Sequence, residues 1–174
     1  MTKTRDIARN GSCRAEAPVG RLEIRWRPSR VRSPLAGRKV ESPADIAALF
    51  WWMENLPEER LFAVNLDDSN RLRHFAEVAR GGSSGLSVSV RDVLRPTLLT
   101  NCRSLVLVHN HPQAEPLPSP QDRRFTRQVM RGCAALGLRF HEHIIMGWGG
   151  RYHLMLAGHD AQLPALEQPS LALT

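Results

Sequence analysis

The sequence predicts a mixed α/β domain of the α+β kind, in which helices flank a central mixed sheet. The chain has 174 residues, 42% of them hydrophobic, which suits one globular domain with a single core. Strand-like and helix-like segments follow one another without a strict strand–helix–strand alternation, which favours a mixed sheet over a purely parallel one. Three cysteines without CxxC spacing indicate neither a thiolate zinc site nor a disulfide framework.

The first elements are a helix and a hairpin. SPADIAALFWWMENL (42–56) begins with an N-cap serine, a proline and an acidic residue three positions after the cap, which predicts a helix to about Asn55. Three segments then predict a largely buried strand, a turn and a partner strand: LFAVNL (61–66), DDSN (67–70) and RLRHFAEVA (71–79).

The middle of the chain predicts a loop, a helix and a central strand. GGSSG (81–85) is loop-like, and VRDVLRPTLLTN (90–101) has a helical pattern in which Pro96 marks a kink or a short first segment. SLVLV (104–108) is continuously apolar, which favours a strand buried on both faces that ends at the histidines after it.

The last elements are a helix and two strands. A helix is expected from Ser119-Pro120 to about Gly137, with one apolar face formed by Phe125, Val129, Cys133 and Leu136. Two strands are expected on either side of GWGG (147–150), from Leu138 to Met146 and from Arg151 to Met155.

The positive charge is concentrated at the N-terminus. Residues 1–40 contain 11 Lys and Arg against 3 Asp and Glu, whereas residues 41–174 contain 13 against 14. We expect a basic leader (1–41) that is disordered or loosely attached, a folded domain (42–158) and a C-terminal tail (159–174). The leader is either a solvated segment without a partner or an arm that binds an acidic partner such as nucleic acid.

The apolar segments exclude a membrane protein at the level of sequence. Runs such as SLVLV and ALFWWM fall far short of the roughly 20 residues that a membrane-spanning helix needs. The N-terminus also lacks the apolar segment of a secretory signal. We therefore expect a soluble, cytoplasmic protein without a membrane partner.

The stretch HNHPQAEPLPSPQD (109–122) carries the strongest indication of chemistry. On a strand, residues two apart point to the same side, so His109 and His111 could face one metal ion. Asp122, beyond a proline-rich loop, could complete a set of three ligands that leaves a position for water, as in catalytic zinc sites. Such a zinc ion lowers the pKa of its water toward about 7.

The same residues also have an interpretation without metal. Ser119 and Asp122 form a Ser-x-x-Asp capping box with a proline between them, and a capping box needs no metal. The histidines could be polar residues where a buried strand emerges. Spacing alone leaves both interpretations open.

The stretch also fits His-x-His-x7-Ser-x2-Asp, the signature of the JAMM (JAB/MPN) metallopeptidase superfamily, and resembles its RadC-like family, the UPF0758 or DNA-repair-protein RadC type. The resemblance covers about residues 42–156 and includes ERLFAVNLD, NCRSLVLVHNHP and ALGLRFHEHIIMG. It implies the JAMM/MPN, cytidine-deaminase-like architecture and zinc-dependent hydrolysis of a peptide or isopeptide bond in a protein or peptide substrate.

The resemblance also implies roles for individual residues. Zinc would be held by His109, His111 and Asp122, with Ser119 positioning the water or stabilising the developing oxyanion. The family's general base is a glutamate at the start of the first core strand. Counting back from the end of that strand aligns Glu59 with it, and its neighbour Glu58 is a rival.

Two features of the sequence depart from the family's pattern. Gln113 and Ala114 stand where the family has a small Ser-Gly, and residues 1–40 show no counterpart of the helix-hairpin-helix region often attached to RadC-like proteins. The second departure counts against a nucleic-acid function borrowed from that region. The alternative function, which the family's DNA-repair label suggests, is a nucleic-acid-associated, DNA-repair-related accessory protein with a structural or vestigial metal. It would use the basic leader and the basic side of a helix formed by Arg123, Arg124, Arg127 and Arg131.

A second histidine pair, in HEH (141–143), offers a competing ligand set with the same spacing. The resemblance implies that His143 lies near the site, behind the metal ligands. A structural role for His141 and His143 is the simpler interpretation, and neither is counted as a ligand.

Overall fold

The computed structural model describes residues 39–81 and 87–156. Most of the predicted leader, most of the GGSSG loop and the predicted C-terminal tail lie outside the described residues. The elements, in chain order, are α1 (Pro43–Leu49), the 3₁₀ helix η1 (Trp51–Asn55), β1 (Arg60–Leu66), β2 (Leu72–Arg80), α2 (Val90–Leu99), β3 (Ser104–Asn110), α3 (Pro120–Ala135), β4 (Arg139–Met146), the 3₁₀ turn η2 (Trp148–Gly150) and β5 (Tyr152–Leu154).

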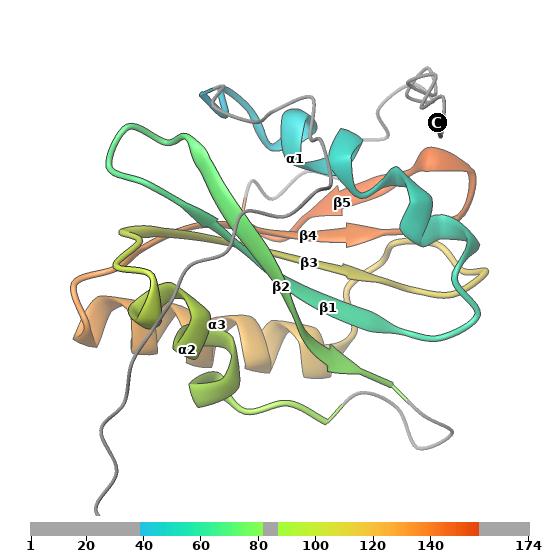
Figure 1. Ribbon diagram of the computed structural model, residues 1–174. Helices are drawn as coiled ribbons and strands as arrows, with labels where there is room; N and C mark the ends of the chain where they lie inside the picture. Colours follow the sequence, from blue (N-terminus) through green and yellow to red (C-terminus); the bar gives the residue numbers. More distant parts are fainter. Residues whose placement is uncertain (1–38, 82–86, 157–174) are drawn as a thin grey trace, which may run out of the picture.

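The five strands form one mixed sheet with the order β2-β1-β3-β4-β5. Three of the four strand pairs are antiparallel, and β3 and β4, which α3 connects, are parallel. Helices α1 and η1 lie on one face of the sheet, and α2 and α3 lie on the other (Figure 1). The expected fold class, a mixed sheet flanked by helices, is confirmed.

Two hydrophobic clusters fill the two sides of the sheet. The alternation of side chains along a strand divides β1 and β3 between them. Val106 and Val108 belong to the cluster under α1 and η1, whereas Leu105 and Leu107 belong to the cluster under α2 and α3. By the same alternation His109 points to the α3 side, where it becomes part of the site.

Strand β3 extends further than its apolar run. It ends at the histidines, as the sequence predicts: His109 pairs with Leu61 of β1 and with Ile145 of β4, and Asn110 is the last strand residue. On the β4 side the pairing continues one residue further, because the backbone of His111 still donates to the carbonyl of Met146 at 2.9 Å. His109 is therefore held on a strand rather than on a loop.

The N-terminal helix is shorter than predicted, since α1 ends at Leu49 and a 3₁₀ helix follows to Asn55. In a 3₁₀ helix, residues three apart lie on the same side. Phe50 and Met53 are three apart and are almost completely buried, so the tighter winding places both in the core. The aromatic run therefore continues as a 3₁₀ helix rather than an α-helix.

Helix α3 buries Val129 and Cys133 as its predicted apolar face, with Phe125 partly buried beside them. The prediction is wrong for Leu136, which is 50% exposed. Leu136 is the C-cap of the helix, and the chain turns away at Gly137, whose φ is +67°. The apolar face therefore ends one turn earlier than its sequence pattern.

A β-bulge in β4 separates the two histidines of HEH. Phe140 pairs with Leu105 and Glu142 pairs with Val106, so His141 is an extra residue between them. A one-residue shift moves the following side chains to the opposite face of a sheet. The bulge therefore places His143 beside His109, while His141 stays exposed. The two histidines do not form a ligand pair.

Among the described residues, no helix is both long enough and apolar enough to cross a membrane.

Lys39 and Val40, at the end of the predicted leader, contact the β1–β2 turn: Lys39 forms a bridge with Arg71, and the backbone of Val40 donates to Asn70 at 2.8 Å. The described domain thus includes residues just before the predicted boundary.

Candidate functional site

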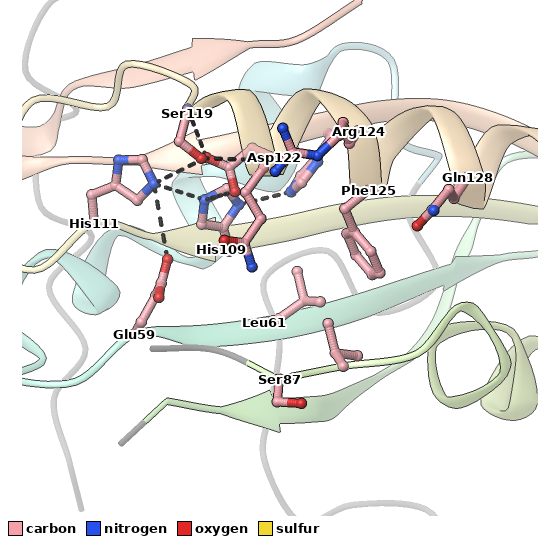
Figure 2. Close-up of a pocket in the computed structure, with 13 residues that line it drawn as sticks. Glu59, Leu61, Ser87, His109, His111, Ser119, Asp122, Arg124, Phe125 and Gln128 are labelled. Carbon is pink, nitrogen blue, oxygen red and sulfur yellow. Dashed lines mark hydrogen bonds and ion pairs between the residues drawn. The ribbon is translucent and has the colours of Figure 1, made fainter. Parts of the chain in front are cut away.

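A pocket of about 510 Å³ lies where β1 begins, β3 ends and α3 begins (Figure 2). All five residues singled out from the sequence as catalytic or metal-binding line it, together with apolar and polar neighbours. The lining residues are Glu59, Leu61, Ser87, Val88, His109, His111, Ser119, Gln121, Asp122, Arg124, Phe125, Gln128 and His143. The structure thus brings together the five candidate residues, which are up to 63 residues apart in the chain.

His109, His111 and Asp122 face one another at short distances. The two Nε2 atoms are 3.0 Å apart, Asp122 Oδ1 is 3.5 Å from His109 Nε2, and Asp122 Oδ2 is 3.6 Å from His111 Nε2. Zinc–ligand bonds of about 2.0–2.2 Å in a tetrahedron place neighbouring ligand atoms about 3.3 Å apart. The observed distances therefore fit three ligands of one tetrahedral ion.

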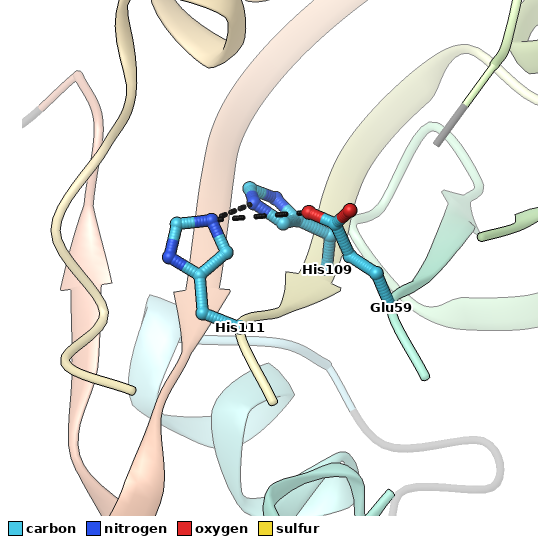
Figure 3. Close-up of side chains that lie close together, drawn as sticks. All are labelled: Glu59, His109 and His111. Atoms are coloured by element: carbon cyan, nitrogen blue, oxygen red, sulfur yellow. Dashed lines mark hydrogen bonds and ion pairs between the residues drawn. The ribbon is translucent and has the colours of Figure 1, made fainter. Parts of the chain in front are cut away.

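Glu59, just before β1, lies beside the two histidines (Figure 3). One ligand atom each of Glu59, His109 and His111 lie within 4.8 Å of one another, so Glu59 is a rival for the third ligand position. Its Oε1 is 3.9 Å from His111 Nε2, longer than either contact of Asp122. We favour Asp122 as the third ligand because its distances to the two histidines fit a tetrahedron better than the longer distance from Glu59 to His111. Glu59 would then be close enough to contact a water bound to the ion.

Glu58 and Glu59 point in different directions. The carboxylate of Glu58 accepts from the Arg60 guanidinium at 2.6 Å and lies 3.6 Å from the Arg80 guanidinium. Glu59 instead lines the pocket and faces His111. Of the two glutamates that the sequence leaves as candidates for the base, Glu59 is the one beside the histidines.

The start of α3 fixes Asp122 through a capping box. Asp122 Oδ2 accepts from the Ser119 backbone at 2.8 Å and from the Ser119 hydroxyl at 2.5 Å, and Ser119 Oγ accepts from the Asp122 backbone at 3.1 Å. These bonds satisfy amides that a helix start leaves without partners. The cap aims Asp122 and also engages the hydroxyl proton of Ser119.

Asn110, the residue between the two histidines, was not singled out from the sequence. Its side chain points to the other side of the strand and is completely buried. Its Oδ1 accepts from the backbone of Arg60 at 2.8 Å, and its Nδ2 donates to the carbonyl of Glu58 at 3.2 Å. These two bonds bracket Glu59. Strand alternation could have indicated that Asn110 faces away from the metal ligands, but its partners lie 50 and 52 residues away in the chain.

Two further polar residues lie behind His109. His109 Nδ1 is 2.7 Å from His143 Nε2, and His143 Nδ1 is 2.7 Å from the hydroxyl of Thr126. Thr126 was also missed, although it follows Asp122 by one helical turn and so shares its side of α3. The position of His143 agrees with the expectation that it lies behind the metal ligands.

The electrostatics of the site favour neutral inner histidines beside a charged carboxylate. Burial lowers the pKa of His109 well below its ordinary value and lowers that of His143 to about 4. For Asp122, burial acts to raise the pKa, but the hydrogen bond with His111, the charge of His109 and the bonds from Ser119 together hold it well below its ordinary range. Unprotonated imidazole and ionised carboxylate are the forms that bind metal.

The two outer groups have pKa values shifted upward. For His111, burial acts to lower the pKa, but the hydrogen bond and charge of Asp122 outweigh it, and the pKa is raised. Burial is the largest cause of the raised pKa of Glu59, with His111 lowering it and Asp122 raising it further. A carboxylate with a raised pKa is a better proton acceptor, as a general base requires.

The loop between the histidines and α3 is anchored at several points. Arg151 Nη1 donates to both carboxylate oxygens of Glu115, at 2.6 and 2.8 Å, and the backbone of Trp148 donates to the Ala114 carbonyl at 3.0 Å. Gln113, where the sequence departs from the family, adopts a left-handed φ of +52°. The residues that differ from the family's pattern thus lie in a fixed turn.

Comparisons with known proteins agree on one family. The family model described as the RadC-like JAB domain matches residues 40–159. UPF0758 proteins from two strains of Chloroflexus aurantiacus are 34% identical over 144 residues, which is 82% of this chain and 62% of theirs. A UPF0758 protein of Methanosarcina acetivorans is 34% identical over 116 residues, 66% of this chain and 50% of its own length.

The chain thus spans about three fifths of the length of the first of these relatives. The matched region contains the whole pocket, from Glu59 to His143. The chain belongs to the RadC-like JAB-domain family.

Proposed function

We propose that this protein is a zinc-dependent hydrolase of the JAMM type that cleaves a peptide or isopeptide amide bond. The observation that supports the proposal best is the convergence of two imidazoles and two carboxylates on one pocket, at distances that suit a tetrahedral ion and a neighbouring base. Membership of the RadC-like family supports a hydrolase of the JAMM superfamily. The geometry of the pocket supports hydrolysis of an amide bond.

The donor set suits zinc better than a harder cation. Two imidazole nitrogens and one carboxylate are ligands of catalytic zinc sites, whereas magnesium and calcium prefer oxygen ligands. His109, His111 and Asp122 would hold the ion. When bound, zinc polarises a carbonyl and lowers the pKa of a water.

Glu59 would act as the general base. Its carboxylate takes a proton from the attacking water while the water oxygen bonds to the amide carbon. It then passes the proton to the amide nitrogen as the carbon–nitrogen bond breaks. General-base groups contribute about 10²–10⁴-fold to rate. The backbone beside Glu59 is fixed by Asn110, so little reorganisation is needed to bring the carboxylate to the water.

Ser119 would act at the same site. Its hydroxyl lines the pocket and donates to Asp122, so its first effect is to orient that ligand. The predicted contact of Ser119 with a developing oxyanion needs its hydroxyl to turn away from Asp122. The Asp122 carboxylate would then keep the hydrogen bond from the Ser119 backbone.

The substrate would lie along α3. One wall of the pocket is apolar, with Leu61, Val88 and Phe125, while Arg124 and Gln128 line it from the exposed side of the helix. An extended peptide segment has both apolar side chains and polar backbone groups, so it suits such a surface.

Zinc binding tests the metal site first. Purified protein that is stripped of metal and titrated with Zn²⁺ at neutral pH should take up one equivalent. The double variant His109→Ala and His111→Ala should lose it. Absence of stoichiometric binding by the wild type, or full retention by the double variant, would remove the basis of the proposal.

Hydrolysis tests the reaction separately, with quenched-fluorescence libraries of mixed-sequence peptides and of peptides joined through a lysine Nε isopeptide bond. Glu59→Gln should lower the rate by about 10²–10⁴-fold while zinc binding is retained. Glu58→Gln is the matched control, because its carboxylate pairs with Arg60 and Arg80, and it should keep most of the activity. Equal rates for Glu59→Gln and the wild type would overturn the role of Glu59.

A second candidate function is nucleic-acid association. Its support is a row of four exposed arginines on α3, with which no carboxylate in the described part of the chain pairs: Arg123, Arg124, Arg127 and Arg131. Binding to duplex DNA should then weaken steeply with salt and fall when residues 1–40 are deleted or these arginines are replaced by glutamine. No binding by the full chain at low salt would exclude this function.

A further inference from the structure

We infer that Thr126 and His143 act as positioning residues, because they form a chain of directed hydrogen bonds that leaves His109 Nε2 as the nitrogen free to bind metal. This inference rests on the proposed metal site. The chain connects three elements: Thr126 on α3, His143 on β4 and His109 on β3. All three side chains are almost completely buried: Thr126 and His109 are 2% exposed and His143 is 1% exposed.

The direction of the chain is set by the Thr126 hydroxyl. Its oxygen is 2.7 Å from the backbone carbonyl of Asp122 and 2.7 Å from His143 Nδ1. A carbonyl oxygen can only accept, so the single hydroxyl proton goes to Asp122. The oxygen of Thr126 must then accept from His143, which places a proton on His143 Nδ1.

The next bond follows from the first. A neutral imidazole carries one proton, so His143 with a proton on Nδ1 has a bare Nε2. That nitrogen is 2.7 Å from His109 Nδ1, which must therefore donate to it. His109 in turn has a bare Nε2. This atom faces His111 Nε2 at 3.0 Å and Asp122 Oδ1 at 3.5 Å, in the place where the ion would bind.

Burial keeps both inner rings neutral, which the chain requires. A doubly protonated His143 would reverse the second bond and put a proton on the metal-binding nitrogen of His109. That state places a cation inside the domain, where an unpaired charge is costly. The carboxylate of Asp122 lies beyond His109 and is engaged by Ser119, and that of Glu142 accepts from the backbones of His143 and Leu156.

His111 has a similar but weaker contact behind its ring. His111 Nδ1 lies 3.4 Å from the backbone carbonyl of Glu115, which would accept its proton when an ion occupies Nε2. That contact is exposed and long, whereas the bonds behind His109 are short and buried. We therefore expect the orientation of His109 to be the more strongly fixed of the two.

Zinc affinity measures the effect of the chain. Thr126→Val keeps the shape of the side chain but removes the hydroxyl, and it should weaken Zn²⁺ binding about 10- to 100-fold in competition with a chelator. Thr126→Ser restores a hydroxyl and should bind zinc nearly as the wild type does. Equal affinities of Thr126→Val and the wild type would overturn the inference.

Thr97→Val is the matched control. Thr97 is a completely buried threonine on α2 whose hydroxyl donates to Asn65 at 2.5 Å, away from the histidines. Loss of the Thr97 hydroxyl should destabilise the fold about as much as Thr126→Val does, without changing zinc affinity. If Thr97→Val weakens zinc binding as much as Thr126→Val does, the effect of Thr126 is general destabilisation and the inference fails.

The metal-free wild type gives a direct test that needs no variant. Long-range ¹H–¹⁵N correlation spectra distinguish protonated from bare ring nitrogens. We expect His109 and His143 to carry their protons on Nδ1 at neutral pH. A proton on Nε2 of His109 would overturn the inference. This result is distinct from a failure of the proposed function, in which the wild type itself binds no zinc.

Discussion

At the scale of single residues, the site is held by side chains that do not themselves react. Spacing on one strand and one helix start made His109, His111 and Asp122 candidates, and only the resemblance to the RadC-like family favoured a metal site over a plain helix cap. Asn110 and Thr126 have no such local pattern, because their partners lie on other elements, and His143 was expected near the site only through the family resemblance. A single sequence does not reveal which buried polar residues are close to one another in space.

Asn110 gives a prediction at this scale. Asn110→Ala leaves the backbone groups of Glu58 and Arg60 without partners, and each unsatisfied buried group costs about 1–3 kcal/mol. Because these groups bracket Glu59, we expect hydrolysis to fall more than stability alone explains. Assays at a temperature where the variant remains folded, with zinc affinity as a second measurement, would separate the two effects.

Asn65→Ala is the control for this prediction. Asn65 is as completely buried as Asn110 and lies on the neighbouring strand, but its partners are Ala63 and Thr97. It should lose stability while the folded fraction keeps its activity. If both variants lose activity in the same proportion, Asn110 has no particular role in holding Glu59.

At the scale of elements, the order of helices and strands follows from sequence periodicity, but their local irregularities do not. The bulge at His141 is an example, because it moves His143 to the α3 side against the two-residue alternation of HEH. The 3₁₀ winding of η1 and the early end of the α3 apolar face also depend on tertiary packing. The unpredicted bulge places a residue of the site.

Gly147 gives a prediction for the loop that carries the metal ligands. A Cβ at this position would lie 2.5 Å from Pro116 Cδ and 2.8 Å from its backbone nitrogen. Gly147→Ala should therefore push the loop between His111 and Ser119 away from β4. We expect destabilisation of about 1–3 kcal/mol, as for other overpacked positions, and weaker zinc binding.

Gly149→Ala is a control two residues away. Its φ of +70° makes any side chain strained, but a Cβ there meets nothing within 4 Å. We expect a loss of stability of about 1–2 kcal/mol from the left-handed backbone alone, with unchanged zinc affinity. Chemical denaturation and chelator competition measure both quantities. Unchanged zinc affinity in Gly147→Ala would show that the loop does not depend on this close contact.

At the scale of the whole molecule, the site lies on the face of the sheet that α2 and α3 cover, at the end of the sheet where α3 begins. β1 begins at one wall of the pocket, β3 ends at the histidines, and α3 begins beside them (Figure 2). Two histidines with lowered pKa values, His109 and His143, are therefore inside the domain rather than on a surface loop. Their protonation is coupled to unfolding of the entire domain.

The metal-free protein should consequently lose stability as pH falls from about 6.5 toward 4. An unfolded histidine has a pKa of about 6.5, and burial lowers that of His143 to about 4, so in this range the unfolded chain binds a proton that the folded chain does not. His109 acts in the same direction. For His143 alone the loss between pH 7 and pH 4 is about 3 kcal/mol.

The other groups of the site do not reverse this trend. The pKa of His111 is raised, so its contribution grows as pH falls toward 6.5 and is constant below that. Glu59 has a raised pKa and opposes the loss only in the lower part of the range, and the lowered pKa of Asp122 removes stability only below about pH 4.

Urea unfolding of chelator-treated protein between pH 7 and pH 4.5 measures how steeply stability depends on pH. His143→Gln removes one of the two buried rings and should reduce the slope, while His74 and His141, whose pKa values burial also lowers, keep part of it; an unchanged slope would mean that the acid sensitivity arises elsewhere in the domain.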